Sequence, residues 1–341
     1  MLAEEKIIRL KPGYHMKAVG VGDLDAVLAT IHAFSQATMG IKEMTRAELK
    51  SFWQTPGLNM ADDLRIVVDP NGKVAGYVEC LTLTSPPVHP YIWLSVHPDS
   101  LDSNVSEVLL DWAIERAKHV TETLPQDLRV SIHMHNIGSF KPWQRLLENA
   151  DFALTRHSFI MHRDIADKPP EPQWPAGITL RPFDPLHHAV DVFLANDEAF
   201  EDHFGHIKQP FEQGFALFKH WLEEPRFDAR LWFVAMEGDE VAGVSLCRVN
   251  EDEETPIGWV GDLSVRRRWR KRGLGMALLL HSFGEFYRRG YKKVGLGVDA
   301  SNLTGALRLY ERAGMYVARR YDRYEKELRP GKELMTIEVK E

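Results

Sequence analysis

The sequence predicts two tandem α/β domains, each with a mixed, mostly antiparallel sheet flanked by helices. Three features indicate this. The chain has 341 residues, and one domain typically takes roughly 150. A segment near residue 73 recurs near residue 240, and a proline-rich stretch separates the two copies. Within each copy, helical and extended patterns alternate in the order that is typical of an α/β domain.

The composition is that of an ordinary globular protein, with 44% hydrophobic, 27% charged and 10% aromatic residues. A formal net charge of -7 argues against general nucleic-acid affinity, which requires a basic surface. No apolar run approaches the ~18 residues of a membrane span, and the acidic start is unlike a signal peptide. Only 2 cysteines are present, so a disulfide framework is excluded. We therefore expect a cytoplasmic protein that binds neither membrane nor nucleic acid.

The repeat is clearest at a pair of hairpins. Lys73–Cys80 matches Glu240–Cys247 with a constant offset of 167 positions. A strand-like run and a short turn precede each copy, as in a β-hairpin. The two cysteines fall on each other in separate copies, so they are expected to be small buried residues and not a disulfide.

A second match fixes the extent of the copies. Leu146–Phe152 corresponds to Leu309–Met315, and the intervening Ala166–Ala176 carries four prolines, as expected of a semi-rigid linker. These matches predict a gene duplication. We expect a first domain over residues 1–165, the linker over 166–176 and a second domain over 177–341.

The second copy carries an unusual basic turn. Trp259–Val265 has the pattern of a strand, and a helix is expected from about Gly273 to Arg289. Between them, Arg266–Arg272 places six basic residues in seven positions. Gly273 and Gly275 then lie at the helix N-terminus, where unpaired backbone N–H groups and the helix dipole favour a phosphate. We expect the glycines to give access and three side chains to supply charge: Arg270, Lys271 and Arg272.

Two other phosphate-binding loops do not fit this stretch. A P-loop needs Gly-Lys-Ser/Thr, which is absent. A dinucleotide fingerprint needs a small residue where Leu278 stands. The pattern Arg/Gln-x-x-Gly-x-Gly/Ala is satisfied by Arg270–Gly275.

With its neighbours, this loop resembles that of the GCN5-related N-acetyltransferase (GNAT) superfamily, which holds the pyrophosphate of acetyl-CoA there. The resemblance covers roughly residues 176–328 and rests on four segments in family order: Leu263–Val265, Arg270–Gly275, Val298–Asn302 and Ala306–Met315. It implies transfer of an acetyl group to a primary amine of a small molecule or peptide, by direct attack on the thioester. The implied acetyl-CoA contacts are Leu263, Ser264, Val265, Arg270, Lys271, Arg272, Gly273, Leu274, Gly275, Met276, Asn302 and Tyr310.

The resemblance also implies catalytic roles. Tyr310 would protonate the departing thiolate, and the alternative for its helical stripe is simple core packing. Asn302 would hold the pantetheine arm, or only cap its helix. In the family, the two central parallel strands splay apart and the pantetheine inserts between them. The alternation of Gly295 and Gly297 gives one of these strands a bare face for a close neighbour or ligand.

The general base is an open choice. Many relatives carry a Glu where this sequence has Trp259, so Asp262 is the first candidate. The second is the cluster containing Glu201, His203 and His206, expected on a loop over the acceptor, or else merely a polar loop. We expect no metal, because His203 with His206, and His133 with His135, lack a third ligand.

The first copy has lost the features of the site. Leu101 replaces Arg270, Asn104 replaces Gly273, Ser106 replaces Gly275 and Leu147 replaces Tyr310. We therefore expect this domain to be non-catalytic. A tandem with one degenerate half is similar to the mycothiol synthases of the family, which leaves acetylation of a thiol conjugate as an alternative.

Two further alternatives come from other classes. One is a non-catalytic CoA-sensing module, and the other a nucleic-acid contact through Arg266–Arg272, which the acidic total charge disfavours. The protein is expected to be a monomer or a homodimer.

Overall fold

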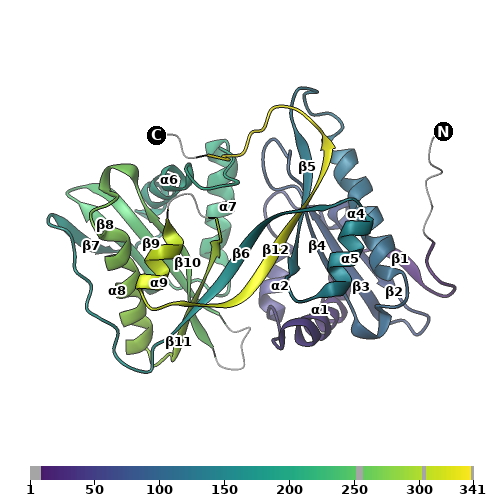
Figure 1. Cartoon of the computed structure of the whole chain (residues 1–341), viewed down its shortest axis with the longest axis horizontal. Coiled ribbons are helices and arrows are strands. Elements are labelled where there is room, and N and C mark those ends of the chain that lie inside the picture. The colour runs from purple at the N-terminus through teal and green to yellow at the C-terminus, as the bar shows by residue number, and fades with distance from the viewer. Residues whose placement is uncertain (1–8, 251–255, 302–304, 339–341) are drawn as a thin grey trace. The chain divides into compact units, whose positions relative to one another are not determined.

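The chain divides into two compact units that exchange strand segments. The computed structural model describes residues 9–250, 256–301 and 305–338 (Figure 1). Unit 1 comprises Met1–Thr155 and Asp322–Leu334, and unit 2 comprises Arg156–Tyr321 and Met335–Glu341. The predicted boundary between the two copies, the proline-rich linker at residues 166–176, lies within unit 2. The compact units differ from the copies, because most of β6 (Ala153–Asp164) belongs to unit 2 and most of β12 (Tyr316–Arg329) to unit 1.

In unit 1, the sheet has the order β1-β2-β3-β4-β5-β12. The pairs from β1 to β4 are antiparallel and β4 runs parallel to β5. The strands are β1 (His15–Ala18), β2 (Leu64–Val68), β3 (Val74–Leu81), β4 (Tyr91–Val96) and β5 (Val130–Ile137). The helices are α1 (Leu24–Met39), α2 (Arg46–Phe52), α3 (Met60–Asp63), α4 (Val105–Thr121) and α5 (Lys141–Asn149).

Unit 2 repeats this plan with the sheet order β6-β11-β10-β9-β8-β7. Only β10 and β11 are parallel among its described pairs. The strands are β7 (Ile178–Pro182), β8 (Trp232–Glu237), β9 (Glu240–Asn250), β10 (Ile257–Val265) and β11 (Lys293–Asp299). The helices are α6 (Ala189–Phe200), α7 (Phe211–Glu223), α8 (Leu274–Arg288) and α9 (Ala306–Arg312). The mixed, mostly antiparallel sheet predicted from the sequence is confirmed.

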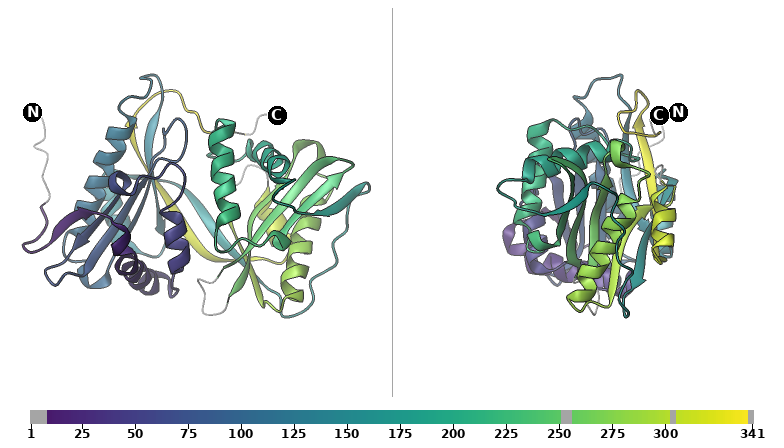
Figure 2. Two further views of the ribbon diagram at one scale, coloured as in Figure 1. Left: turned by 180° about the vertical axis from the view of Figure 1, so that it is seen from behind. Right: turned by 90° about the vertical axis from the view of Figure 1, so that its left-hand side faces the viewer.

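Each sheet buries apolar residues on both faces. Along β8, Phe233 and Ala235 pack with α8 and α9, whereas Trp232, Val234 and Met236 pack with α6 and α7. This alternation follows the two-residue period of a strand. Figure 2 shows helices on both sides of the strands of unit 2.

At one glycine of this sheet a helix approaches closely. A Cβ at Gly258 would lie 2.4 Å from Cγ of Phe286, so the bare backbone allows α8 to lie close to β10. The close packing sets the position of the whole helix, including its N-terminus. No helix in the described ranges is long and apolar enough to span a membrane.

Candidate active site

The parallel strands β10 and β11 separate after a short pairing. Their ladder consists of Gly258 with Val294 and Trp259 with Gly295, although β10 continues to Val265. Over the same stretch β10 stays paired with β9 as far as Val265 and Gly243. The backbone of residues 263–265 therefore has an open edge toward β11, as the family resemblance implied.

The start of α8 presents unpaired backbone amides. Gly273 is the N-cap with φ 89°, and Lys271 also has a positive φ of 62°. Within the described ranges, the first amide of this stretch to find a helical acceptor is that of Ala277, 3.1 Å from the Gly273 carbonyl oxygen. The amides of residues 271–276 therefore remain available to a ligand, and the helix dipole favours an anion there. Nothing lies within 4 Å of a Cβ built at Gly273, so the space beside these amides is open.

Arg270, which the sequence predicts to supply charge at this opening, has a protein acceptor for each of its guanidinium nitrogens. Its Nε donates to the Val265 carbonyl oxygen at 3.0 Å, and its Nη2 to the Ala199 carbonyl oxygen at 3.0 Å. Its Nη1 contacts a carboxylate oxygen of Asp202 at 2.5 Å. The guanidinium is held by acceptors of the protein itself, because α6 ends beside the end of β10.

The other four arginines of the run are also paired. Carboxylates from α6, the loop that follows it and the β8–β9 hairpin neutralise them: Arg266 with Glu198, Arg267 with Glu201 and Asp202, Arg268 with Glu240, and Arg272 with Glu237. Nη2 of Arg272 lies 2.8 Å from Oε1 of Glu237, and the Arg272 side chain is partly exposed. Lys271 is exposed and makes no ion pair within the part of the chain that the structure describes. Anion binding at this loop would therefore depend on the backbone amides, with Lys271 and Arg272 as the cations that directly precede Gly273 in the chain.

A β-bulge presents Asp262. The register of β10 against β9 shifts between Val260 and Asp262, so one strand carries an extra residue. The equivalent β4 pairs with β3 without any shift. A bulge bends a strand and re-aims a side chain. Unit 2 therefore has a bulge beside Asp262 that the equivalent strand pair of unit 1 lacks.

Asp262 and Tyr310 lie within electrostatic reach of each other. Burial raises the pKa of Asp262, while a hydrogen bond from Asn196 and the charge of Arg248 oppose the rise. Burial also raises the pKa of Tyr310 to about 12, and the negative charge of Asp262 contributes. Tyr310 is 7% exposed and remains protonated at neutral pH, as a proton donor must. A carboxylate with a raised pKa is a stronger base than an ordinary one.

The acceptor-loop candidates follow α6 directly. Glu201 pairs with Arg267 at 3.3 Å, and His206 lies 4.0 Å from Asp197. Burial and the charge of Arg270 lower the pKa of His203, which favours its neutral form. The loop is also fixed by Thr336, whose backbone bonds with Gly205 and His206 at 2.9 and 2.8 Å. Sequence reasoning missed this contact, since nothing in the C-terminal residues signals it.

The glycines of β11 and the start of α9 differ from what the sequence predicts. Gly295 does have a bare face, but Trp259 fills it: a Cβ there would lie 2.7 Å from Cζ3 of that ring. Gly297 remains exposed. Asn302 lies outside the described residues, and the N-cap of α9 is Gly305 with φ 76°, three positions later than expected.

Unit 1 keeps the helix start but covers it. Asn104 is the N-cap of α4 and keeps a positive φ of 55°. Its Nδ2 donates to the Arg9 carbonyl oxygen at 2.5 Å, and Lys11 Nζ to the Asp102 carbonyl oxygen at 2.8 Å. Residues 9–11 thus contact this loop. Leu147, in the place of Tyr310, is fully buried at 0% exposure and has no hydroxyl group that could donate a proton.

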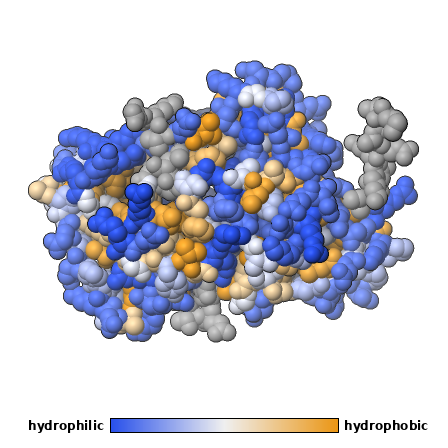
Figure 3. Space-filling model, viewed as in Figure 1, coloured by the Kyte–Doolittle hydropathy of each residue, from blue (hydrophilic) through white to orange (hydrophobic). Residues whose placement is uncertain are grey.

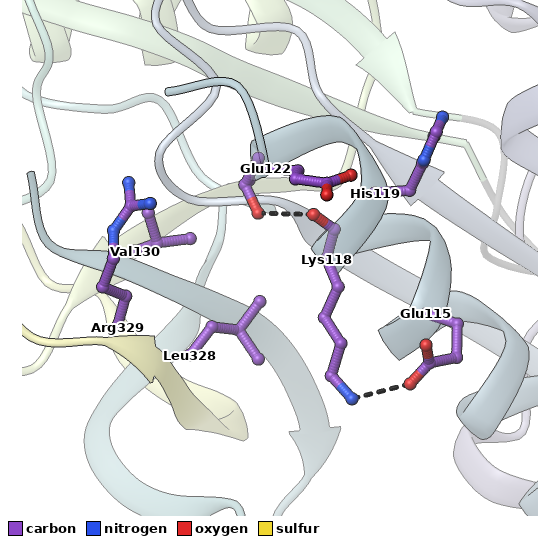
Figure 4. Close-up of a pocket in the computed structure, with 8 residues that line it drawn as sticks. Glu115, Lys118, His119, Glu122, Val130, Leu328 and Arg329 are labelled. Atoms are coloured by element: carbon purple, nitrogen blue, oxygen red, sulfur yellow. Dashed lines mark hydrogen bonds and ion pairs between the residues drawn. The ribbon is translucent and has the colours of Figure 1, made fainter. Parts of the chain in front are cut away.

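Two cavities of unit 1 lie along α4. One of about 370 Å³ lies between the start of α4 and α5, and its lining includes two carboxylates, Glu107 and Asp111, and one cation, Arg145. The other, of about 490 Å³, lies at the opposite end of α4 (Figure 4). There Lys118 is paired with Glu115 at 2.6 Å. Among the described residues, no group of three His, Cys, Asp or Glu side chains could hold a metal ion.

Known proteins match this arrangement. The model of the acetyltransferase (GNAT) family matches residues 193–315. A mycothiol acetyltransferase of Frankia alni is 30% identical over 277 residues, which are 74% of this chain and 80% of that protein. A mycothiol acetyltransferase of Salinispora arenicola is 33% identical over 72% of this chain and 75% of its own length. A GCN5-related N-acetyltransferase from Sphaerobacter thermophilus superimposes with a TM-score of 0.78 at 31% identity, covering 96% of this chain and 99% of that one.

A splayed parallel strand pair beside an amide-lined helix start defines a GNAT-type acyltransferase. The chain belongs to the GNAT family of acetyltransferases, and its activity is that of an N-acetyltransferase. A tandem GNAT protein from the clavulanic acid pathway shares the two-unit fold with a TM-score of 0.69 at 14% identity.

Proposed function

We propose that the protein transfers an acetyl group from acetyl-CoA to a primary amine of a small molecule or peptide. The observation that carries this proposal is the row of open amides at residues 271–276 beside the gap between β10 and β11. A diphosphate would accept hydrogen bonds from these amides, with Lys271 and Arg272 close by. The remainder of the cofactor would extend along the open edge of residues 263–265.

The apolar surroundings suit the uncharged pantetheine arm. α9 carries the half-buried Leu307 and Leu309, and Figure 3 shows apolar surface around this helix. A backbone N–H in the stretch 263–265 would polarise the thioester carbonyl, as an oxyanion donor does. These contacts would hold the acetyl group within reach of Asp262 and Tyr310.

The reaction requires the acceptor nitrogen to lose two protons and the departing sulfur to gain one. A protonated amine cannot attack, so Asp262 would take the first proton from it, directly or through water. The amine nitrogen then bonds to the thioester carbon and loses its second proton to water, the carbon–sulfur bond breaks, and the sulfur takes a proton from Tyr310, which water restores. In this scheme Glu201, His203 and His206 would contact the acceptor.

The names of the relatives favour a second, narrower candidate. Several relatives are mycothiol acetyltransferases, which favours an acceptor amine that belongs to a thiol conjugate. Trp259 stands at the place where many family members carry a carboxylate, so the base would again be Asp262. We further propose that the first copy, residues 1–165, is non-catalytic, since residues 9–11 contact the vestigial loop.

Calorimetry and a thiol assay test the main proposal together. We expect one acetyl-CoA to bind per chain, and free CoA thiol to appear when a reactive amine from a panel of simple amines and thiol-conjugated amines is added. Thiol release without any acetylated amine would indicate hydrolysis alone. Binding without transfer to any acceptor would favour a CoA-sensing module, and an absence of binding would overturn the proposal.

The Tyr310→Phe variant tests the proton donor. The ring fills the same buried space, so we expect acetyl-CoA affinity to change less than twofold. Turnover should fall at least 100-fold, because general acid catalysis typically contributes 10²–10⁴-fold. Unchanged turnover would leave Tyr310 with a packing role only. Tyr287→Phe, on α8 at the edge of the same apolar cluster, is the matched control and should retain full turnover.

A further inference from the structure

We propose that Asn196 is a positioning residue for this reaction: its side-chain amide holds the carboxylate of Asp262 in the orientation in which it removes a proton. The inference rests on the proposed function, because it assigns a partner to the proposed base. Asn196 belongs to α6, outside the four segments that carry the family resemblance.

The contact is direct and buried. Nδ2 of Asn196 donates to Oδ2 of Asp262 at 2.7 Å. Asn196 is 8% exposed, and Asp262 is partly buried at the bulge of β10. A charge-assisted hydrogen bond of this length fixes the rotation of a carboxylate.

The other end of the Asn196 amide indicates why this residue is polar. Its Oδ1 is buried and has no hydrogen-bond partner among the described residues. A buried carbonyl oxygen without a partner costs free energy, which an apolar side chain of similar size would avoid. The side chain is therefore oriented by its contact with Asp262 and not by its own hydrogen-bonding needs.

The remaining groups around Asp262 do not replace this donor. Arg248 and Cys247 on β9 and Tyr310 on α9 lie within electrostatic range of its carboxylate. Arg248 acts through its charge, and its guanidinium also lies 5.9 Å from the ring of Trp259. Burial raises the pKa of the Cys247 thiol to about 11, so it stays neutral, as does Tyr310. Asn196 is the neighbour whose hydrogen bond to Asp262 the structure defines.

The position of Asn196 is itself anchored. Two residues later on α6, Glu198 pairs with Arg266 at 2.6 Å, just beyond the end of β10. Asp202, which follows the helix, holds Arg267 and Arg270. These ion pairs fix α6 against the strand that carries Asp262, and they give these arginines a structural role.

The pH profile of kcat/KM in the Asn196→Ala variant tests the inference. Burial favours protonated Asp262, and the hydrogen bond from Asn196 opposes this. Removing the donor should therefore raise the pKa of Asp262 and move the acidic limb of the profile upward by about one pH unit. At pH values below this limb, kcat/KM of Asn196→Ala should be about tenfold lower than that of the wild type, and it should recover at higher pH. Acetyl-CoA affinity should stay within twofold of the wild type, because Asn196 does not touch residues 271–276.

Two matched variants make the result decisive. Val192→Ala removes a fully buried side chain one turn earlier on α6, so it should lower stability without moving the limb. Asp262→Asn should abolish the limb. If the limb is lost in Asp262→Asn but unmoved in Asn196→Ala, the positioning role is wrong and the proposed function stands. If Asp262→Asn keeps both the limb and the turnover, the proposed base is wrong and this inference falls with it.

Discussion

Replacing Gly273 with valine is expected to weaken acetyl-CoA binding by about 100-fold or more. The glycine has φ 89° and leaves open space beside the amides of residues 271–276. A valine would fill that space and also disfavour the left-handed backbone that aims the amides. Hydrogen bonds to a charged group contribute about 1.5–3 kcal/mol each, so losing two of them reduces affinity by roughly 100-fold or more. Calorimetric titration of the folded variant measures the change directly.

A glycine beyond the other end of α8 provides a control for the backbone strain of placing valine at a positive φ. Gly290 follows the other end of α8 with φ 88°, and nothing lies within 4 Å of a Cβ built there. Gly290→Val therefore carries a similar backbone cost at a place without open amides. We expect it to lower stability and leave acetyl-CoA affinity unchanged. Equal loss of affinity in the two variants would show that helix destabilisation, and not access to the amides, explains the effect.

The sequence revealed the loop but not the partners of its arginines. The glycines, the preceding strand and the helix are local features, so their order along the chain was enough to predict a phosphate-binding helix start. The partners of Arg270 and Arg267 are set by tertiary packing, since Asp202 lies more than 60 positions earlier. The basic run Arg266–Arg272 was therefore predicted to be available to a ligand, whereas most of its side chains form ion pairs within the protein.

Three other features of the structure depend on contacts between segments that lie far apart in the sequence. A single extra residue in β10 creates the bulge at Asp262, and only the register against β9 shows it. The exchange of β6 and β12 leaves no trace in the sequence, because either strand has the same pattern whichever unit it joins. Asn196 carried no sequence signal, since an isolated Asn in a helix is ordinary until its partner is known.

Replacing Asp202 with alanine is expected to destabilise unit 2 by about 2 kcal/mol. The carboxylate is 3% exposed and holds two guanidinium groups, those of Arg267 at 2.8 Å and Arg270 at 2.5 Å. Removing one partner of a fully buried ion pair costs about 3–5 kcal/mol. The two arginines here are 47% and 27% exposed, so water can replace part of the lost contact and the cost is smaller. Thermal unfolding should show a midpoint lowered by roughly 4–8 °C.

The pH dependence of stability provides an independent check on this ion pair, and its sign follows from the pKa. Hydrogen bonds from Arg267 and Arg270 lower the pKa of Asp202 from 3.8 to about 2. A carboxylate whose pKa is lowered by folding stabilises the protein above its unfolded pKa and loses that contribution as the pH falls through the folded value. The difference in the free energy of unfolding between wild type and Asp202→Ala should therefore be constant above about pH 4 and shrink between pH 4 and 2.

Glu240→Ala is the matched control for Asp202→Ala, because it removes the exposed partner of an exposed arginine. The side chains of Glu240 and Arg268 are 52% and 63% exposed. Surface pairs contribute about 0–1 kcal/mol, so this control should barely change the midpoint, and an equal loss in both variants would refute the anchoring role of Asp202.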